Sequence, residues 1–94
     1  MKTFTVKAVI DGDTFSVVNG WKWGNFKGSD IRPTGYDTPE KGQPGYQLAT
    51  EQLRKLIEGK QVELKNPVNV SYGRLVCDVY YKGKNLADYF LKYS

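Results

Sequence analysis

The sequence predicts a small α+β domain, mainly β with helices, whose centre is a closed five-stranded Greek-key barrel. Short stretches of alternating or β-branched residues recur along the chain, and glycine-containing turns separate them. A single long stretch, midway along the chain, has the period of an amphipathic helix. Ninety-four residues, 39% of them hydrophobic and 26% charged, suit one core, so residues 1–94 are expected to form one domain.

The first third of the chain predicts two strands and an irregular connection. Thr3–Ile10 alternates polar and apolar residues, as a half-buried strand does. Asp11-Gly12-Asp13 is a turn sequence that leads into a second strand, Thr14–Val18. Residues 21–28 are rich in glycine, and we expect an irregular connection or a short hairpin there.

A third strand and the helix follow. Residues 29–36 favour a strand, and Pro33 within them is expected at an edge or a bulge because proline has no N–H to donate. The proline- and glycine-rich residues 37–45 predict a loop. Tyr46–Glu58 carries apolar residues at helical spacing, with Gly59 as its C-terminal cap.

The last third predicts two strands and a short helix. Gln61–Lys65 alternates, and Pro67 is expected to end that strand. Leu75–Tyr81 is the fifth strand, and Leu86–Tyr93 is expected to be a short helix. With one helix between the third and fourth of five strands, the order suits the barrel of the OB-fold, which binds oligonucleotides or oligosaccharides.

Composition narrows the chemistry. Fourteen basic against ten acidic residues give a net charge of +4, which favours a polyanionic partner. The absence of histidine excludes imidazole catalysis, and the single Cys77 excludes disulfides and cysteine-cluster metal sites, so any metal must be a hard cation held by oxygen. No apolar stretch approaches the roughly 20 residues that span a bilayer, and Met1–Ile10 lacks a signal peptide's apolar block. We expect a monomer with no membrane partner.

Carboxylates cluster at two expected strand ends. Asp13 lies in the turn after the first strand, and Asp37 follows the third strand. Two such carboxylates, with a backbone carbonyl and water, can hold a hard divalent cation. Glu40 lies three residues beyond Asp37, where it can orient or deprotonate a water.

Two arginines complete the set. Arg32 and Arg74 offer planar guanidinium groups that bind phosphate oxygens in pairs and stay charged. A cation, two guanidinium groups and a carboxylate that activates water suit phosphodiester hydrolysis. Taken singly, each of these motifs is also an ordinary turn sequence, so their joint occurrence carries the interpretation.

Together these motifs resemble the staphylococcal nuclease (thermonuclease) family. The segments that match in order and spacing are residues 9–14, Ile31-Arg32, residues 37–40 and Tyr72-Gly73-Arg74, and the resemblance covers essentially the whole chain. It implies a five-stranded barrel with helices and a Ca²⁺-dependent nuclease that cuts DNA and RNA with little sequence specificity. It implies three calcium ligands, one activator of water and two phosphate-binding arginines: Asp13, Asp37 and the carbonyl of Thr38; Glu40; Arg32 and Arg74.

The sequence also departs from that family. Val70 replaces an acidic residue common two positions before the tyrosine of Tyr-Gly-Arg, and residues 33–36 replace an aliphatic run. We expect the domain to lack the third, C-terminal helix of the secreted enzymes.

Aromatic residues suggest where bases bind. Tyr72 lies next to Arg74, and Trp21 and Trp23 flank Lys22, an arrangement that can stack bases and pair with phosphates of a single strand. The alternative for the indoles is packing in the core or over the barrel's edges. For the whole domain, the alternative to a nuclease is a catalytically silent nucleic-acid-binding module on the same fold.

Overall fold

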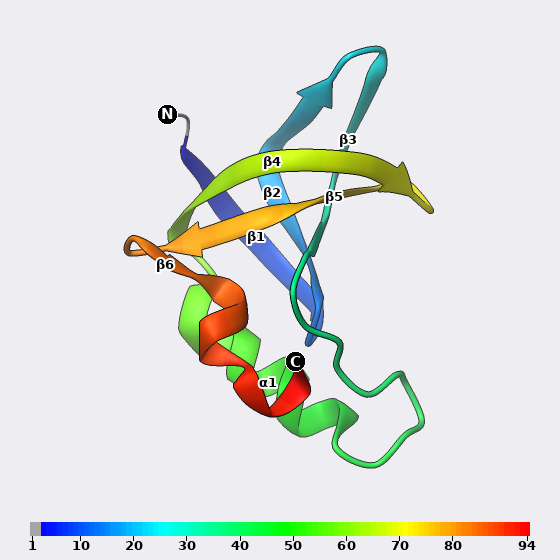
Figure 1. Ribbon diagram of the computed structural model, residues 1–94, viewed down its shortest axis with the longest axis vertical. Helices are drawn as coiled ribbons and strands as arrows, with labels where there is room; N and C mark the ends of the chain where they lie inside the picture. Colours follow the sequence, from blue (N-terminus) through cyan, green and yellow to red (C-terminus); the bar gives the residue numbers. More distant parts are fainter. Residues whose placement is uncertain (1–2) are drawn as a thin grey trace.

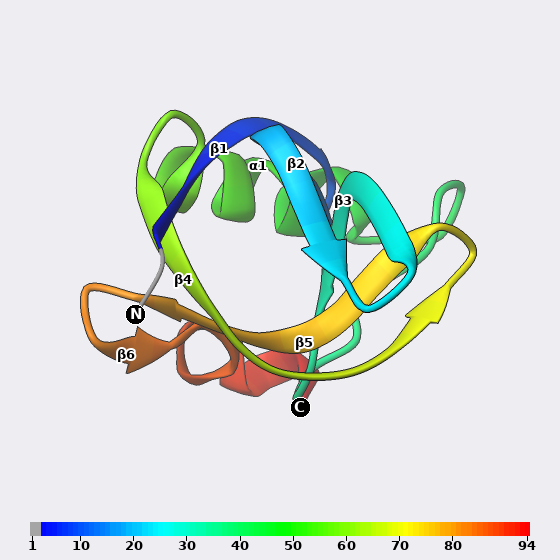
Figure 2. The same ribbon diagram turned by 90° about the horizontal axis from the view of Figure 1, so that it is seen from above.

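The computed structural model describes residues 3–94. Five strands coil into a closed barrel, and a two-residue strand lengthens its edge (Figures 1 and 2): β1 (Thr3–Asp11), β2 (Thr14–Trp23), β3 (Phe26–Pro33), β4 (Gln61–Ser71), β5 (Arg74–Tyr81) and β6 (Lys84–Asn85). The sheet order is β3-β2-β1-β4-β5-β6. One α-helix, α1 (Tyr46–Ile57), connects β3 to β4. The predicted five-stranded α+β barrel is therefore confirmed.

The barrel closes through a parallel pairing of β3 with β5, whereas its other neighbouring strands run antiparallel. In this pairing Asp30 lies opposite Arg74, and Pro33 lies opposite Cys77. The N–H of Thr34 continues the ladder by donating to the carbonyl of Cys77 at 3.0 Å. Closure thus places β3 beside the first half of β5 and the segment that follows β3 beside the middle of β5, although some forty residues separate the two strands.

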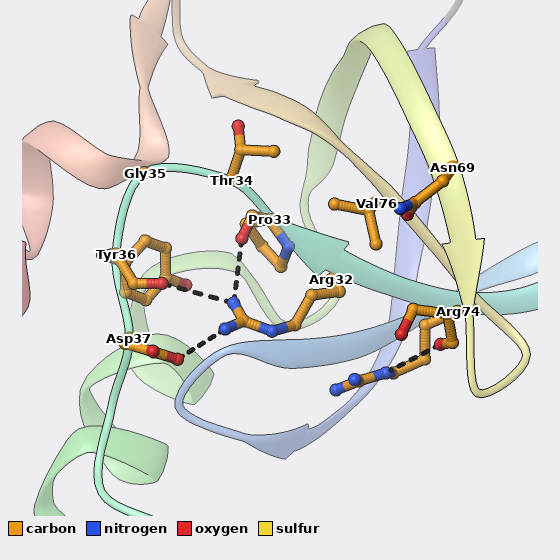
Figure 3. Close-up of a pocket in the computed structure, with 10 residues that line it drawn as sticks. Arg32, Pro33, Thr34, Gly35, Tyr36, Asp37, Asn69, Arg74 and Val76 are labelled. Carbon is orange, nitrogen blue, oxygen red and sulfur yellow. Dashed lines mark hydrogen bonds and ion pairs between the residues drawn. The ribbon is translucent and has the colours of Figure 1, made fainter.

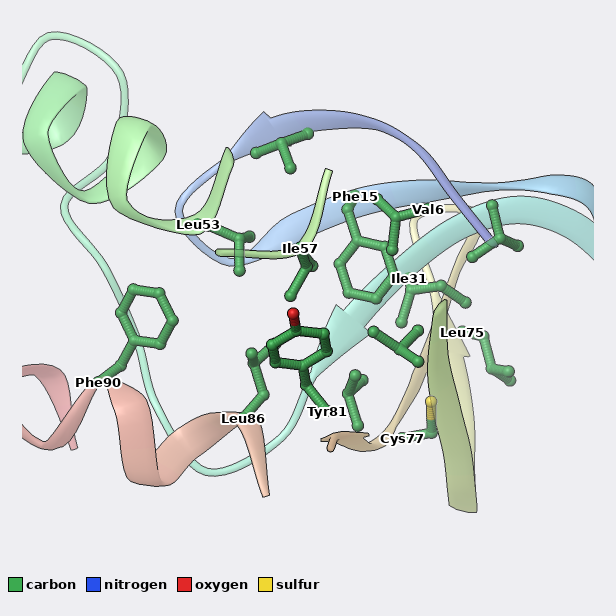
Figure 4. Packing of buried hydrophobic residues seen from close by; sticks show 14 of the residues in the cluster. Val6, Phe15, Ile31, Leu53, Ile57, Leu75, Cys77, Tyr81, Leu86 and Phe90 are labelled. Carbon is green, nitrogen blue, oxygen red and sulfur yellow. The ribbon is translucent and has the colours of Figure 1, made fainter. Parts of the chain in front are cut away.

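The core fills the barrel and extends below it to the helix (Figure 4). Phe15, Ile31 and Cys77 from three strands are fully buried, and Leu53 and Ile57 of α1 cover the end of the barrel. Burial of such side chains contributes about 1.5–3 kcal/mol each. The apolar stripe predicted for the helix therefore faces the core as expected.

Two strands run further than the sequence predicts. β2 continues through Trp23 and forms a hairpin with β3, so of the two alternatives expected for residues 21–28 the short hairpin is confirmed and the irregular connection was wrong. β4 continues through Pro67 to Ser71, so the expected end at Lys65 was wrong. Pro67 is exposed and lies at a shift of register between Lys65 and Asn69, where the ladder does not need its missing N–H.

Two further elements differ in detail. The third strand ends at Pro33, which is buried at its last position, so residues 34–36 belong to the next loop. The expected helix over 86–93 consists of two 3₁₀ turns, η1 (Leu86–Tyr89) and η2 (Leu91–Tyr93), interrupted by Phe90. Asn85 caps the first of them by accepting the N–H of Ala87 at 2.9 Å. Within the described part of the chain, no helix has the length and apolar character needed to cross a membrane.

Candidate active site

The turn between β1 and β2 presents Asp13. The carboxylate of Asp11 accepts the N–H of Asp13 at 3.2 Å, which fixes the turn. Gly12 lies between these two residues, and the loop after β3 and the helix α1 both approach it closely. A β-carbon at position 12 would lie 2.7 Å from Oγ1 of Thr38 and 2.9 Å from the β-carbon of Ala49. Glycine is required at this position because the backbone approaches the loop so closely.

The loop that follows β3 is fastened on two sides. On one side, the hydroxyl of Tyr36 donates to the carbonyl of Gly12 at 3.0 Å, and the N–H of Thr38 donates to Oδ2 of Asp13 at 3.3 Å. On the other side, the N–H of Asp37 donates to the carbonyl of Tyr93 at 3.0 Å. The barrel turn and the C-terminal 3₁₀ segment thus both determine where Asp37 lies.

Arg32 brings the two carboxylates together. Its Nη2 lies 2.5 Å from Oδ1 of Asp37 and 3.6 Å from Oδ2 of Asp13. Its Nη1 donates to the carbonyls of Pro33 and Tyr36 at 3.0 and 3.2 Å (Figure 3). Both carboxylates are therefore aimed at one point, at which the guanidinium group of Arg32 lies.

Arg74 lies on the same cleft, at the beginning of β5. Its Nη1 donates to Oγ1 of Thr14 at 3.2 Å, and its Nε donates to the carbonyl of Ser71 at 3.3 Å. The hydroxyl of Thr14 in turn lies 3.4 Å from Oδ1 of Asp13. Arg32 and Arg74 both line a cleft of about 470 Å³, so the structure brings both guanidinium groups to one surface (Figure 3).

Glu40 and Tyr72 lie outside this set of contacts. The backbone of Glu40 bonds with Gln43 at both its N–H and its carbonyl. Its exposed carboxylate forms no hydrogen bond or ion pair with the described residues, and it does not line the cleft. Tyr72 is 95% exposed at the tip of the β4–β5 turn, with its ring centre 6.0 Å from the guanidinium carbon of Arg74.

The proposed stacking surface requires one correction. Trp21 is only 5% exposed, and its indole N–H donates to the carbonyl of Asp30 at 2.8 Å. Its ring belongs to the core, so the expectation that Trp21 stacks on a base was wrong. Trp23 is partly buried and Lys22 is exposed. Both remain on the surface of the β2–β3 hairpin.

Electrostatics distinguish Asp13 from an ordinary surface carboxylate. Burial raises the pKa of Asp13, and the neighbouring Asp11 adds to the rise. The positive charge of Arg32 and the N–H of Thr38 oppose it. Burial also raises the pKa of Tyr36, so its hydroxyl keeps the proton that it donates to Gly12.

The oxygen atoms around Asp13 fit a hard cation. Two carboxylates converge on one point, and on the same side of the Asp13 turn Oγ1 of Thr38 is buried against Gly12 without a hydrogen-bond partner. Within residues 3–94, however, no three His, Cys, Asp or Glu residues form a metal-binding group. A cation bound by Asp13 and Asp37 would therefore need backbone carbonyl and water oxygens as well, which Ca²⁺ accepts because it takes six to eight oxygen ligands.

Sequence reasoning missed the residues that connect the site. Thr14 links Arg74 to Asp13, and Tyr36 links the β1–β2 turn to the following loop. Thr14 belongs to the motif Asp11-Gly12-Asp13-Thr14, so its position was a usable signal. No signal in the sequence marks Tyr36, because only the fold shows that its hydroxyl donates to the carbonyl of Gly12.

Comparison with known proteins identifies relatives of this chain. The profile of a family described as "Staphylococcal nuclease homologue" matches residues 30–93, which include Arg32, Asp37, Glu40 and Arg74. The chain is 37% identical over 62 residues to the Staphylococcal-like nuclease CAN1 of Arabidopsis thaliana, covering 66% of this chain and 19% of that protein. It is 33% identical over 75 residues to an uncharacterized endonuclease of Escherichia coli O157:H7, covering 80% of this chain and 46% of that protein. The chain thus spans less than half the length of these relatives.

Proposed function

The chain belongs to the family of staphylococcal nuclease homologues, and from this membership we propose that it is an endonuclease that hydrolyses phosphodiester bonds of DNA and RNA. The observation that carries the proposal is the cleft itself. Asp37 and the two arginines line it, and Asp13 contacts Arg32 next to it, so two carboxylates and two guanidinium groups lie together; phosphodiester hydrolysis needs both kinds of charge. Little sequence specificity is expected, since contacts to phosphate dominate and phosphates carry no sequence information.

The proposed cofactor is Ca²⁺, held by Asp13, Asp37 and the backbone carbonyl of Thr38. When bound, the cation supplies Lewis-acid stabilisation of charge on phosphoryl oxygens and lowers the pKa of a bound water. The two convergent carboxylates support this assignment, because hard oxygen donors are the ligands that Ca²⁺ prefers.

The two arginines act differently in this proposal. Nη2 of Arg74 has no partner among the described residues, so it is available to a phosphate oxygen while Nη1 and Nε hold the side chain in place. Arg32 already pairs with Asp13 and Asp37. For Arg32 to bind phosphate, its Nη2 has to exchange a carboxylate oxygen for a phosphate oxygen, and a cation at the carboxylates favours that exchange.

Glu40 is the proposed activator of water. Its carboxylate is exposed on the same loop as Asp37 and Thr38, and it has no internal partner among the described residues that would compete for a proton. A positioned carboxylate of this kind acts as a general base and contributes about 10²–10⁴-fold to the rate.

A second candidate function is a binding module that holds nucleic acid without cutting it. The pairing of Arg32 with both carboxylates favours this alternative, because it satisfies the charges of the site internally. The presence of Arg74 on the same cleft and of Glu40 on the loop of Asp37 favours the enzyme, since a module that only binds needs no carboxylate free to activate water.

The test is digestion of single-stranded DNA and RNA by the purified chain with Ca²⁺, with Mg²⁺ or with a chelator. We expect cleavage with Ca²⁺, none with chelator, and a loss of about 10²-fold or more in Glu40→Gln. Glu63→Gln, which removes the same charge from β4, is the matched control and should cleave like the original chain. Binding without cleavage under every metal would establish the binding module instead.

A further inference from the structure

The β2–β3 hairpin extends from the barrel at the end opposite α1 (Figure 1). Its register pairs Lys22 with Lys27 and Trp23 with Phe26. Both lysines are exposed, Phe26 is 56% exposed, and Trp23 is partly exposed. Since successive residues of a strand point to opposite faces, the hairpin carries a pair of ammonium groups on one face and a pair of aromatic rings on the other, where Trp23 also packs against the core.

The facing lysines have no internal counter-charge. Like charges directly opposite each other on paired strands destabilise a sheet. All four ion pairs among residues 3–94 involve Arg32 or Arg54, so no carboxylate of the described chain neutralises Lys22 or Lys27. Both lysines line a cleft of about 650 Å³ together with Phe4 and Trp21. A bound anion would relieve their repulsion.

The hairpin lies next to the turn that carries Tyr72. A β-carbon built on Gly28 would lie 3.3 Å from the carbonyl oxygen of Gly73, so β3 and the β4–β5 turn are in contact. Figure 2 shows the two turns on the same side of the barrel. Since Tyr72 neighbours Arg74, the exposed aromatic and basic side chains run from the active-site cleft through this turn to the hairpin.

We propose that the β2–β3 hairpin is a second contact surface for single-stranded nucleic acid, where a strand passing around the hairpin places phosphates against Lys22 and Lys27 on one face and bases against Trp23 and Phe26 on the other. The proposal rests on the proposed function, because the strand held there is the continuation of the strand in the cleft. A single strand fits this surface better than a duplex, since only unpaired bases expose faces for stacking.

The proposed binding of phosphates by Lys22 and Lys27 is tested by measuring affinity under conditions that prevent cleavage. Fluorescence anisotropy in chelator measures the affinity for a single-stranded oligonucleotide of about 16 nucleotides, the upper span of one such barrel. In Lys22→Gln/Lys27→Gln the slope of log affinity against log salt should fall by about 1.4, since each phosphate contact on a single strand contributes about 0.7. Lys55→Gln/Lys60→Gln, which removes the same charge near the end of α1, should leave the slope unchanged. Equal effects of the two double variants would overturn the proposal.

The proposed stacking of bases on the aromatic rings is tested by substitutions of Phe26. Phe26→Leu should weaken binding of the single strand at least about fivefold, because base–aromatic stacking is lost, whereas Phe26→Trp should restore it. Affinity for a duplex of the same length should change less than twofold. Leucine binding as tightly as phenylalanine, or an equal loss for duplex, would show that no base stacks there.

Activity on two substrates separates this inference from the proposed function. The lysine double variant should cleave a dinucleotide as the original chain does, yet lose efficiency on the long oligonucleotide. If the original chain binds but never cleaves, the nuclease assignment fails while the anisotropy results still decide the hairpin. If the original chain cleaves and the variants bind like it, the nuclease assignment survives and the hairpin surface does not.

Discussion

The hydroxyl of Thr14 lies 3.2 Å from Nη1 of Arg74, and this contact joins two motifs that are 60 residues apart. Thr14 is buried, and the same hydroxyl reaches Asp13 at 3.4 Å. The side chain of Thr14 therefore connects Arg74, which is expected to bind phosphate, to Asp13, which is expected to bind the cation. The candidate active site depends on this kind of connection as much as on the charged residues themselves.

Thr14→Val tests that connection. Valine keeps the shape of threonine but leaves Arg74 without its anchor, and the lost hydrogen bond should lower turnover about tenfold, which corresponds to ~1.4 kcal/mol. The measurement is kcat and KM on single-stranded DNA with Ca²⁺. Thr14→Ser retains a hydroxyl and should restore most of the rate. A valine variant with unchanged turnover would show that Arg74 needs no anchor.

Phe90→Leu tests how the C-terminal segment supports the loop of Asp37. The rings of Phe90 and Tyr36 are stacked, with centroids 4.7 Å apart and planes 6° apart. Losing this contact should lower the free energy of unfolding by about 1–2 kcal/mol. Urea denaturation measures this loss of stability. As the control, Phe26→Leu at an exposed position should change the free energy of unfolding by less than about 0.5 kcal/mol. The Ca²⁺ concentration needed for activity should also rise in Phe90→Leu. Equal stability of the two variants would contradict this role for the stack.

Asp78 predicts a dependence of stability on pH. Hydrogen bonds from Asn66 and Thr34 lower the pKa of Asp78 below its ordinary 3.8. The carboxylate therefore stabilises the fold above pH 3.8, and this contribution disappears as the pH falls through the lowered value. Asp78→Asn should be less stable than the original chain at pH 6 by about 1 kcal/mol, and the difference should vanish in strong acid. A difference that persists or grows in acid would contradict this interpretation.

Cys77 predicts protection from thiol reagents. Its side chain is fully buried, and burial raises the pKa of the thiol to about 12. Since the thiolate is the reactive form, the native protein should react with iodoacetamide at pH 8 far more slowly than the unfolded chain. Mass spectrometry across a urea series should show labelling that follows unfolding. Labelling of the native chain at the unfolded rate would contradict the burial of Cys77.

The fold was largely predictable because hydrophobic period and turn residues determine it locally. The helix over residues 46–57 and the β1–β2 turn at Gly12 follow from such local signals. The length of β4 did not, because a proline is tolerated where the register shifts at Pro67, and only the sheet reveals that shift. The burial of Trp21 also depends on tertiary structure, since its indole N–H donates to the carbonyl of Asp30 in the folded barrel.

The sequence predicts which residues form the candidate site, and their roles stay predictions, but it does not predict how these residues are arranged. Motif spacing identifies Asp13, Asp37 and Arg32, whereas the contact of both carboxylates with one nitrogen of Arg32 depends on the pairing of β2 with β3 and on the hydrogen bonds that hold the loop after β3. Sequence motifs also do not show that the carboxylate of Glu40 forms no hydrogen bond or ion pair with the described residues.

The central claim is that Asp13 and Asp37 form one cation site, and calorimetric titration with Ca²⁺ in the absence of nucleic acid tests it most directly. We expect one Ca²⁺ per chain, with the affinity at least about tenfold weaker in Asp13→Asn and in Asp37→Asn. The loss of binding free energy in the double variant should not exceed the sum of the losses in the two single variants, because both substitutions damage the same site. Calcium binding that neither substitution weakens would contradict the account.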